Sequence, residues 1–174
     1  MEFYLSLSCH ISTTGHRAQK FILRRFFHEQ FKHLRDFHQE HNLNSAHTFN
    51  PANIKEVGPF CFLPLITCGS GKIVELDVIL LSHFEPQNRV GYQTGDVDNK
   101  LKSILDGLRM AQNKNEIRSE QVQEGEEIFY TLLEDDALVS RVNIRHERLL
   151  FNLEEEPNKR DTFTLIHVKI RNKF

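Results

Sequence analysis

Apolar and polar residues follow two patterns over the first third of the chain. Residues 2–12, which contain the run Phe3-Tyr4-Leu5-Ser6-Leu7, predict a β-strand. From Arg17 to Phe37, apolar residues recur every three or four positions, which predicts an amphipathic helix. Its expected buried stripe comprises Leu23, Phe26, Phe27, Phe31, Leu34 and Phe37. Its expected solvated side carries Arg24, Arg25, Lys32 and Arg35.

The next part of the chain predicts two strands joined by a turn. Residues 60–67 are apolar, but Pro64 lacks a backbone donor, so we expect an edge strand or a packed loop. Residues 72–82 are rich in β-branched side chains and predict a central strand. Because Gly69-Ser70-Gly71 separates the two runs, we expect them to pair as a hairpin. Residues 40–59 and 83–95 predict irregular connections.

A second helix is predicted from about residue 98. Its apolar residues have the i, i+3, i+4, i+7 spacing of an amphipathic helix and are Leu101, Ile104, Leu105 and Leu108. Asp98 occupies the expected N-cap position. At 100° per residue Asp98, Lys102 and Asp106 form one row beside the apolar stripe, and Asp96 precedes it in the loop. One edge of the helix therefore carries acid, base and acid.

The last third predicts three more strands. Residues 109–127 are rich in glutamate with little apolar pattern, so we expect a surface insertion or mobile flap. The runs 128–133 and 139–151 predict strands with Glu134-Asp135-Asp136 between them, and 162–171 predicts a last strand that closes the domain in a hairpin. The sequence thus predicts an α/β (α+β) fold, a small mixed β-sheet with two main helices, in one domain spanning residues 1–174.

Composition adds limits on compartment and cofactors. The chain contains no apolar run of about 18 residues and its N-terminus lacks the pattern of a secretion signal, so we expect a cytoplasmic protein without a membrane span. Three cysteines without metal-ligand spacing argue against a disulfide framework and against structural zinc.

Charge is unevenly distributed, although the formal net charge is only −2. The segment from Arg17 to Arg35 contains six basic residues and one acid. The segment from Glu116 to Asp136 contains eight acids and one basic residue. These segments predict a positive face that contacts DNA phosphates and an acidic segment that meets a protein partner. The candidate DNA-binding residues are Arg17, Lys20, Arg24, Arg25 and Arg89.

Aspartates near the second helix suggest a site for a hard divalent cation. Asp96 and Asp98 lie near a helix N-terminus, and Asp136 supplies a third carboxylate. The simpler alternatives are a capping loop at Asp98 and a turn at Asp135 and Asp136.

The ordered set of these residues resembles the signature of the RusA family of Holliday junction resolvases. It reads Asp96-x-Asp98-Asn99-x-x-Lys102-x-x-x-Asp106-x-Leu108, then Asp135-Asp136-Ala137-x-Val139. The resemblance implies a homodimer that cuts four-way DNA junctions with Mg²⁺, for which Mn²⁺ can substitute. It implies that Asp96, Asp98 and Asp136 bind the metal and that Lys102 is catalytic. Asn99, Asp106 and Asp135 would support them.

Three alternatives stay open. One is a nuclease of the same fold that acts on forks, flaps or single strands. Another is a catalytically silent DNA- or protein-binding module, in which the carboxylates serve as helix cap and turn. The third is a regulatory subunit that uses residues 109–127 as its interface.

Overall fold

The computed structural model describes residues 1–9, 11, 17–41, 49–82, 94–118, 120–149 and 162–173. Its helices and strands, in chain order, are β1 (Glu2–Cys9), α1 (Arg17–Glu40), β2 (Lys55–Val57), β3 (Phe60–Ile66), β4 (Lys72–Ser82), α2 (Thr94–Leu108), β5 (Phe129–Leu133), β6 (Val139–Arg148) and β7 (Thr162–Asn172). Short 3₁₀ helices occur at η1 (Pro51–Asn53), η2 (Lys114–Glu116) and η3 (Asp136–Leu138). The mixed α/β class with two main helices is therefore confirmed.

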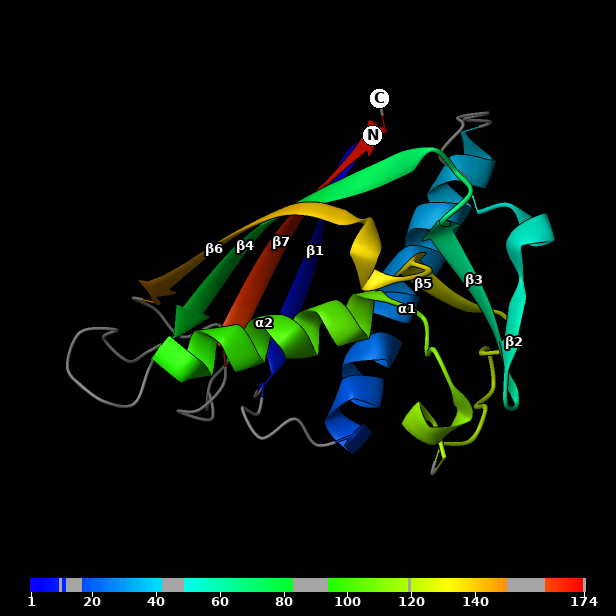
Figure 1. The fold of residues 1–174 in the computed structure, drawn as a ribbon, viewed down its shortest axis with the longest axis horizontal. Coiled ribbons are helices and arrows are strands. Elements are labelled where there is room, and N and C mark those ends of the chain that lie inside the picture. Colours follow the sequence, from blue (N-terminus) through cyan, green and yellow to red (C-terminus); the bar gives the residue numbers. More distant parts are fainter. Residues whose placement is uncertain are drawn as a thin grey trace.

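The strands form two sheets rather than one (Figure 1). The larger sheet has the order β1-β7-β4-β6, and the smaller one has the order β2-β3-β5. Strand β4 lies inside the larger sheet, antiparallel to β7 and parallel to β6, which confirms the prediction of a central strand at residues 72–82. The first strand pairs with the last one, Glu2 opposite Lys169.

Both predicted hairpins are wrong. Strands β3 and β4 belong to different sheets, and β6 and β7 lie on opposite sides of β4. The turn at residues 69–71 joins β3 to β4, but the two strands do not pair. Nearly all side chains of β3 are buried, as in β5, its parallel neighbour, whereas β4 alternates between buried and half-buried positions.

Pro64 lies in the central strand of the smaller sheet, not in the edge strand that we expected. Strand β2 pairs with Phe60, Cys61 and Phe62, so within the described residues no strand lies beside Pro64 on that side. On the other side Pro64 lies opposite Thr131 of β5. A proline fits here because the edge of β3 is open beyond β2.

The two helices and one face of each sheet enclose the main apolar core. In it Leu23, Phe27 and Phe31 of α1 and Ile104 and Leu108 of α2 are fully buried. A second cluster of buried residues joins α1 to the smaller sheet and to the chain after α2, and comprises Phe21, Phe60, Phe62, Met110, Ala111, Ile117 and Phe129. Residues 109–127 are therefore not only a surface insertion, because Met110, Ala111 and Ile117 complete this core.

Helix α1 is buried on two sides, which corrects the predicted stripe. Phe26 and Phe37 are 44% and 51% exposed, although their spacing placed them in the core. Arg24 and His28 are instead 1% exposed, because the second cluster packs against their side of the helix. Periodicity alone could not show this second contact.

Helix α2 begins at Thr94, four residues before the predicted start, so Asp98 is not the N-cap. Asp96 and Asp98 both lie within the first turns of the helix. Of the predicted stripe, Ile104 and Leu108 are buried and Leu101 and Leu105 are half-buried.

Gly107 provides a test of the contact between the helices. A Cβ atom there would lie 2.9 Å from Leu23 Cβ and 3.1 Å from Phe27 Cε2. Overpacking costs about 1–3 kcal/mol, which exceeds the about 1 kcal/mol that alanine gains over glycine in a helix. We expect Gly107→Ala to lower the free energy of unfolding measured in urea. Gly69→Ala is the control, because no atom lies within 4 Å of its added Cβ; a Gly107→Ala protein as stable as this control would contradict the close contact.

Candidate functional site

Two predicted catalytic side chains lie exposed on α2. Asp98 and Lys102 are one helical turn apart, and neither forms an ion pair within the described part of the chain. Asn99 between them is half-buried. The side chain of Asp96 is not among those that the structure describes. This half of α2 thus presents an exposed acid and base.

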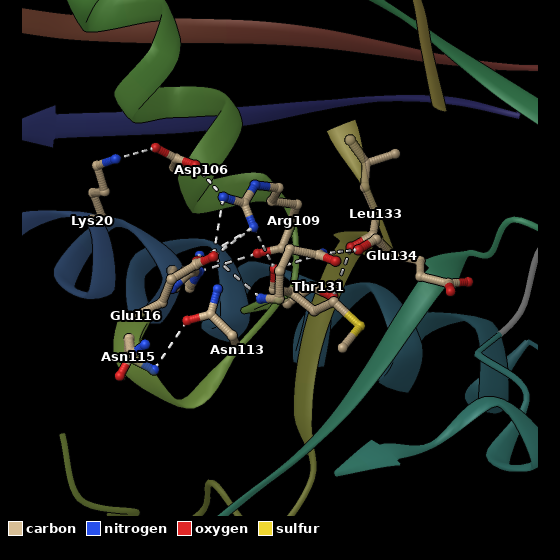
Figure 2. Close-up of polar contacts among 12 residues, drawn as sticks. Lys20, Asp106, Arg109, Asn113, Asn115, Glu116, Thr131, Leu133 and Glu134 are labelled. Carbon is tan, nitrogen blue, oxygen red and sulfur yellow. Dashed lines mark hydrogen bonds and ion pairs between the residues drawn. The ribbon is translucent and has the colours of Figure 1, made fainter. Parts of the chain in front are cut away.

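Asp106, in contrast, forms ion pairs with other side chains of the protein. Its carboxylate lies 2.5 Å from Lys20 Nζ of α1 and 2.6 Å from Arg109 Nη2 (Figure 2). Burial alone would raise the pKa of Asp106, but the hydrogen bond from Lys20 and the charge of Arg109 outweigh burial and lower the pKa. Asp106 therefore ties the end of α2 to α1 and does not pair with Lys102.

Arg24 is a buried cation held by the chain that follows α2. Its Nη2 lies 2.6 Å from Glu116, and its Nε donates to the carbonyl oxygen of Arg109 at 3.1 Å. Arg109 also contacts Glu116, at 3.3 Å. Burial lowers the pKa of Arg24 and Glu116 opposes this shift, although a guanidinium keeps its proton in proteins. The expectation that Arg24 lies on the solvated side of the helix is wrong, since the side chain is 1% exposed.

A polar pocket of about 340 Å³ adjoins these ion pairs. Its lining residues are Lys20, Arg24, Arg109, Asn113, Asn115 and Glu116. Figure 2 shows Asn113 and Asn115 in the turn that carries Glu116. The cations in its wall are already paired with Asp106 and Glu116, so the pocket offers little net positive charge.

Arg25 is neutralised in the same way. It lies 2.6 Å from Glu126 and 3.1 Å from Glu120, and its guanidinium lies 4.8 Å from the centre of the Phe21 ring. The predicted positive face of α1 and the acidic segment thus contact each other. Of the predicted DNA-binding residues, Lys20, Arg24 and Arg25 all form internal ion pairs. Arg89 and the Arg17 side chain lie outside the described residues.

The acids after β5 lie near the other end of α2. Asp135 is the N-cap of η3, where its carboxylate accepts from the Ala137 N–H at 2.8 Å, as the turn alternative anticipated. Glu134 accepts from Lys55 Nζ and from the Cys68 N–H. Asp136 is exposed. Burial alone would lower the pKa of Arg109, but the charges of Glu116, Asp106 and Asp136 outweigh burial and raise it.

These positions do not bring Asp98 and Asp136 together within the chain. The Met110 N–H donates to Leu133 O at 2.9 Å, and Arg109 is bridged to Leu133, so the end of β5 meets the C-terminal end of α2. Asp98 lies eight residues before Asp106, about 12 Å along the helix axis at 1.5 Å per residue. No group of three His, Cys, Asp or Glu side chains in the described part of the chain is placed to hold a metal ion. Asp98 and Asp136 are therefore not placed to share one ion, and the three-carboxylate magnesium site, whose Asp96 side chain lies outside the described residues, stays a prediction.

Replacing Glu116 tests the buried ion pair. Glu116→Gln leaves the Arg24 guanidinium without its carboxylate, and a hydrogen bond to a charged group contributes about 1.5–3 kcal/mol. We expect a decrease of this size in the free energy of unfolding in urea. Glu120→Gln is the matched control, because Arg25 keeps Glu126 and solvent contact, and it should cost no more than about 1 kcal/mol. Equal effects of the two changes would show that the Arg24 ion pair contributes no more to stability than the pair of Arg25 with Glu120.

The lowered pKa of Asp106 predicts a pH dependence. A depressed folded-state pKa stabilises the fold above the ordinary value of 3.8, and this contribution is lost as pH falls through the folded-state pKa. We therefore expect Asp106→Asn to be less stable than the wild type at pH 7, by a margin that shrinks at pH 3. Urea unfolding at both pH values measures the margin, and a margin that stays constant would exclude this role for Asp106.

Comparison with known proteins adds no relative. No protein-family model, no curated protein and no solved structure matches this chain. Neither α1 nor α2, the long helices of the described ranges, is apolar enough over its length to cross a membrane.

Proposed function

We propose that this protein is an endonuclease that cuts branched DNA, with the four-way junction as its substrate. The proposal rests on the ordered residues of α2 and η3 that resemble the RusA signature. The observation that carries it is the exposure of the predicted catalytic side chains that the structure describes. Asp98, Lys102 and Asp136 are exposed and form no ion pair within the described ranges, so a DNA phosphate has access to each.

The predicted supporting residues behave differently. Asp106 forms an ion pair that holds α2 in place, and Asp135 caps η3. Lys102 suits the reaction, since an exposed ammonium can neutralise the charge that develops on a phosphate.

A requirement for Mg²⁺ stays a prediction. Asp98 and Asp136 lie toward opposite ends of α2, so one protomer does not hold an ion between them, and we assign no step of the reaction to the metal. Magnesium sites commonly use one or two carboxylates together with substrate phosphates and water. Activity with and without the ion therefore tests the cofactor separately from the substrate.

A second candidate is a DNA- or protein-binding module without catalysis. It is favoured by the structural roles of Asp106 and Asp135, which are those expected if the carboxylates only cap and pair. It is also consistent with the internal pairing of Lys20, Arg24 and Arg25, which leaves these cations less available to a DNA backbone.

A cleavage assay distinguishes the two. The protein is incubated with labelled four-way junction, fork and linear duplex, with Mg²⁺, with Mn²⁺ and with a chelator. We expect paired nicks in the junction and a loss of about 100-fold or more in Asp98→Asn and Lys102→Ala. Glu40→Gln, which alters an exposed acid at the far end of α1, is the control and should cut normally.

Each other outcome has a defined meaning. Cutting of the fork alone would keep the nuclease and replace its substrate. Cutting that persists in both variants would exclude the α2 site. No cutting of any DNA, with junction binding retained, would favour the binding module.

A further inference from the structure

The polar pocket beside the Arg24 ion pair has room for a small ligand. Its volume of about 340 Å³ lies at the lower end of the range typical of ligand pockets, about 300–1,000 Å³. Lys20 and Arg24, which lie one turn apart on α1, line the pocket from one element. Asn113 and Asn115 line it from the turn that holds η2. Two separate segments of the chain thus turn polar side chains toward one space.

Arg24 has a hydrogen-bond donor left for this pocket. Its Nε donates to the carbonyl oxygen of Arg109 and its Nη2 donates to Glu116, but its Nη1 has no hydrogen-bond partner in the described part of the chain. The buried side-chain atoms that lack a partner there are His28 Nε2 and Thr164 Oγ1, so Nη1 is not sealed within the protein. Because the Arg24 side chain is 1% exposed, the pocket that it lines is the space that Nη1 reaches.

The neighbouring polar groups of the pocket also offer donors. Lys20 carries three N–H groups and, within the described ranges, forms an ion pair with one carboxylate, that of Asp106. The side-chain oxygen of Asn113 accepts from the Asn115 N–H, which leaves the amide N–H₂ group of Asn113 for the pocket. Both carboxylate oxygens of Glu116, by contrast, already accept from arginine side chains. A ligand that binds here must therefore supply acceptor oxygens.

The charge around the pocket suits a single anionic group. The cations Lys20, Arg24 and Arg109 outnumber the carboxylates Asp106 and Glu116 by one. One net positive charge is too little for a polyanionic backbone, which takes a series of unpaired cations along a surface. A phosphate monoester carries its charge of about −1.5 to −2 on one group. Guanidinium and ammonium groups are common phosphate partners in proteins.

We propose that this pocket binds one phosphate monoester group. Arg24 Nη1, Lys20 Nζ and the Asn113 amide supply three donors for the three terminal oxygens of the phosphate, whereas a planar carboxylate has two oxygens. The pocket lies beside the C-terminal end of α2, while Asp98 and Lys102 lie in the first half of that helix. The proposal therefore does not depend on the nuclease activity.

Titration calorimetry at constant ionic strength tests the proposal, with inorganic phosphate and with adenosine monophosphate as probes. We expect both to bind the wild type. In Asn115→Asp we expect a dissociation constant raised about tenfold or more, because the new carboxylate in the pocket wall repels the anion. Asn115 is exposed, and its side chain forms no hydrogen bond with the described residues, so this variant should fold. Circular dichroism checks the fold.

A matched variant controls for the change in net charge. Asn172→Asp makes the same substitution at an exposed position in β7, away from the pocket, and should bind phosphate as the wild type does. If Asn115→Asp binds phosphate as tightly as this control, or if the wild type binds no phosphate, the proposal is overturned. Acetate that binds as tightly as phosphate would also overturn it, because the pocket would then be a carboxylate site.

Competition with DNA distinguishes the sources of the phosphate group. Adenosine monophosphate is displaced with a single-stranded oligonucleotide that carries a 5′-phosphate, and with the same strand ending in a 5′-hydroxyl. Displacement by the phosphorylated strand alone would support the proposal with a nucleic-acid end as the source. Displacement by neither strand would support it with a free small molecule as the source. Equal displacement by both would overturn it, because internal phosphates would then be the ligand.

Discussion

The buried guanidinium of Arg24 is the constraint on which much of the structure depends. A charge removed from water must be paired, because an unpaired buried charge costs several kcal/mol. The chain after α2 meets this need with Glu116 and with the carbonyl oxygen of Arg109, and in doing so carries Met110, Ala111 and Ile117 into the second apolar cluster. One ion pair thereby fixes α1, the end of α2 and the smaller sheet relative to each other.

Local pattern was enough to predict most elements but not their partners. The strands β1, β4 and β7 and the two helices follow from periodicity, which each segment carries by itself. The two sheets, the parallel pair of β4 and β6 and the second buried side of α1 depend on residues far away in the chain. Phe26 shows the limit of this reasoning. It lies in a helix as predicted, but it is exposed where the pattern predicted burial.

For the candidate site, too, the sequence predicted the kinds of residue better than their positions in space. The sequence placed Asp98 and Lys102 on an exposed edge of α2, but it placed Asp106, which is half-buried, in the same row. It could not show that Asp136 lies near the C-terminal end of that helix, because the bridge between Arg109 and Leu133 is a long-range contact. Nor could two opposite charge runs reveal that Arg24 and Arg25 pair with Glu116, Glu120 and Glu126, although their opposite signs were a usable signal.

The pairing of the first strand with the last has a consequence for synthesis. Strand β7 lies between β1 and β4, so neither of these strands has this neighbour until residues 162–172 have left the ribosome. Chains are made from the N-terminus at about 5–20 residues per second. Until then β1 has no strand neighbour in the described sheet and β4 can pair only with β6, so the larger sheet closes only as β7 inserts between them.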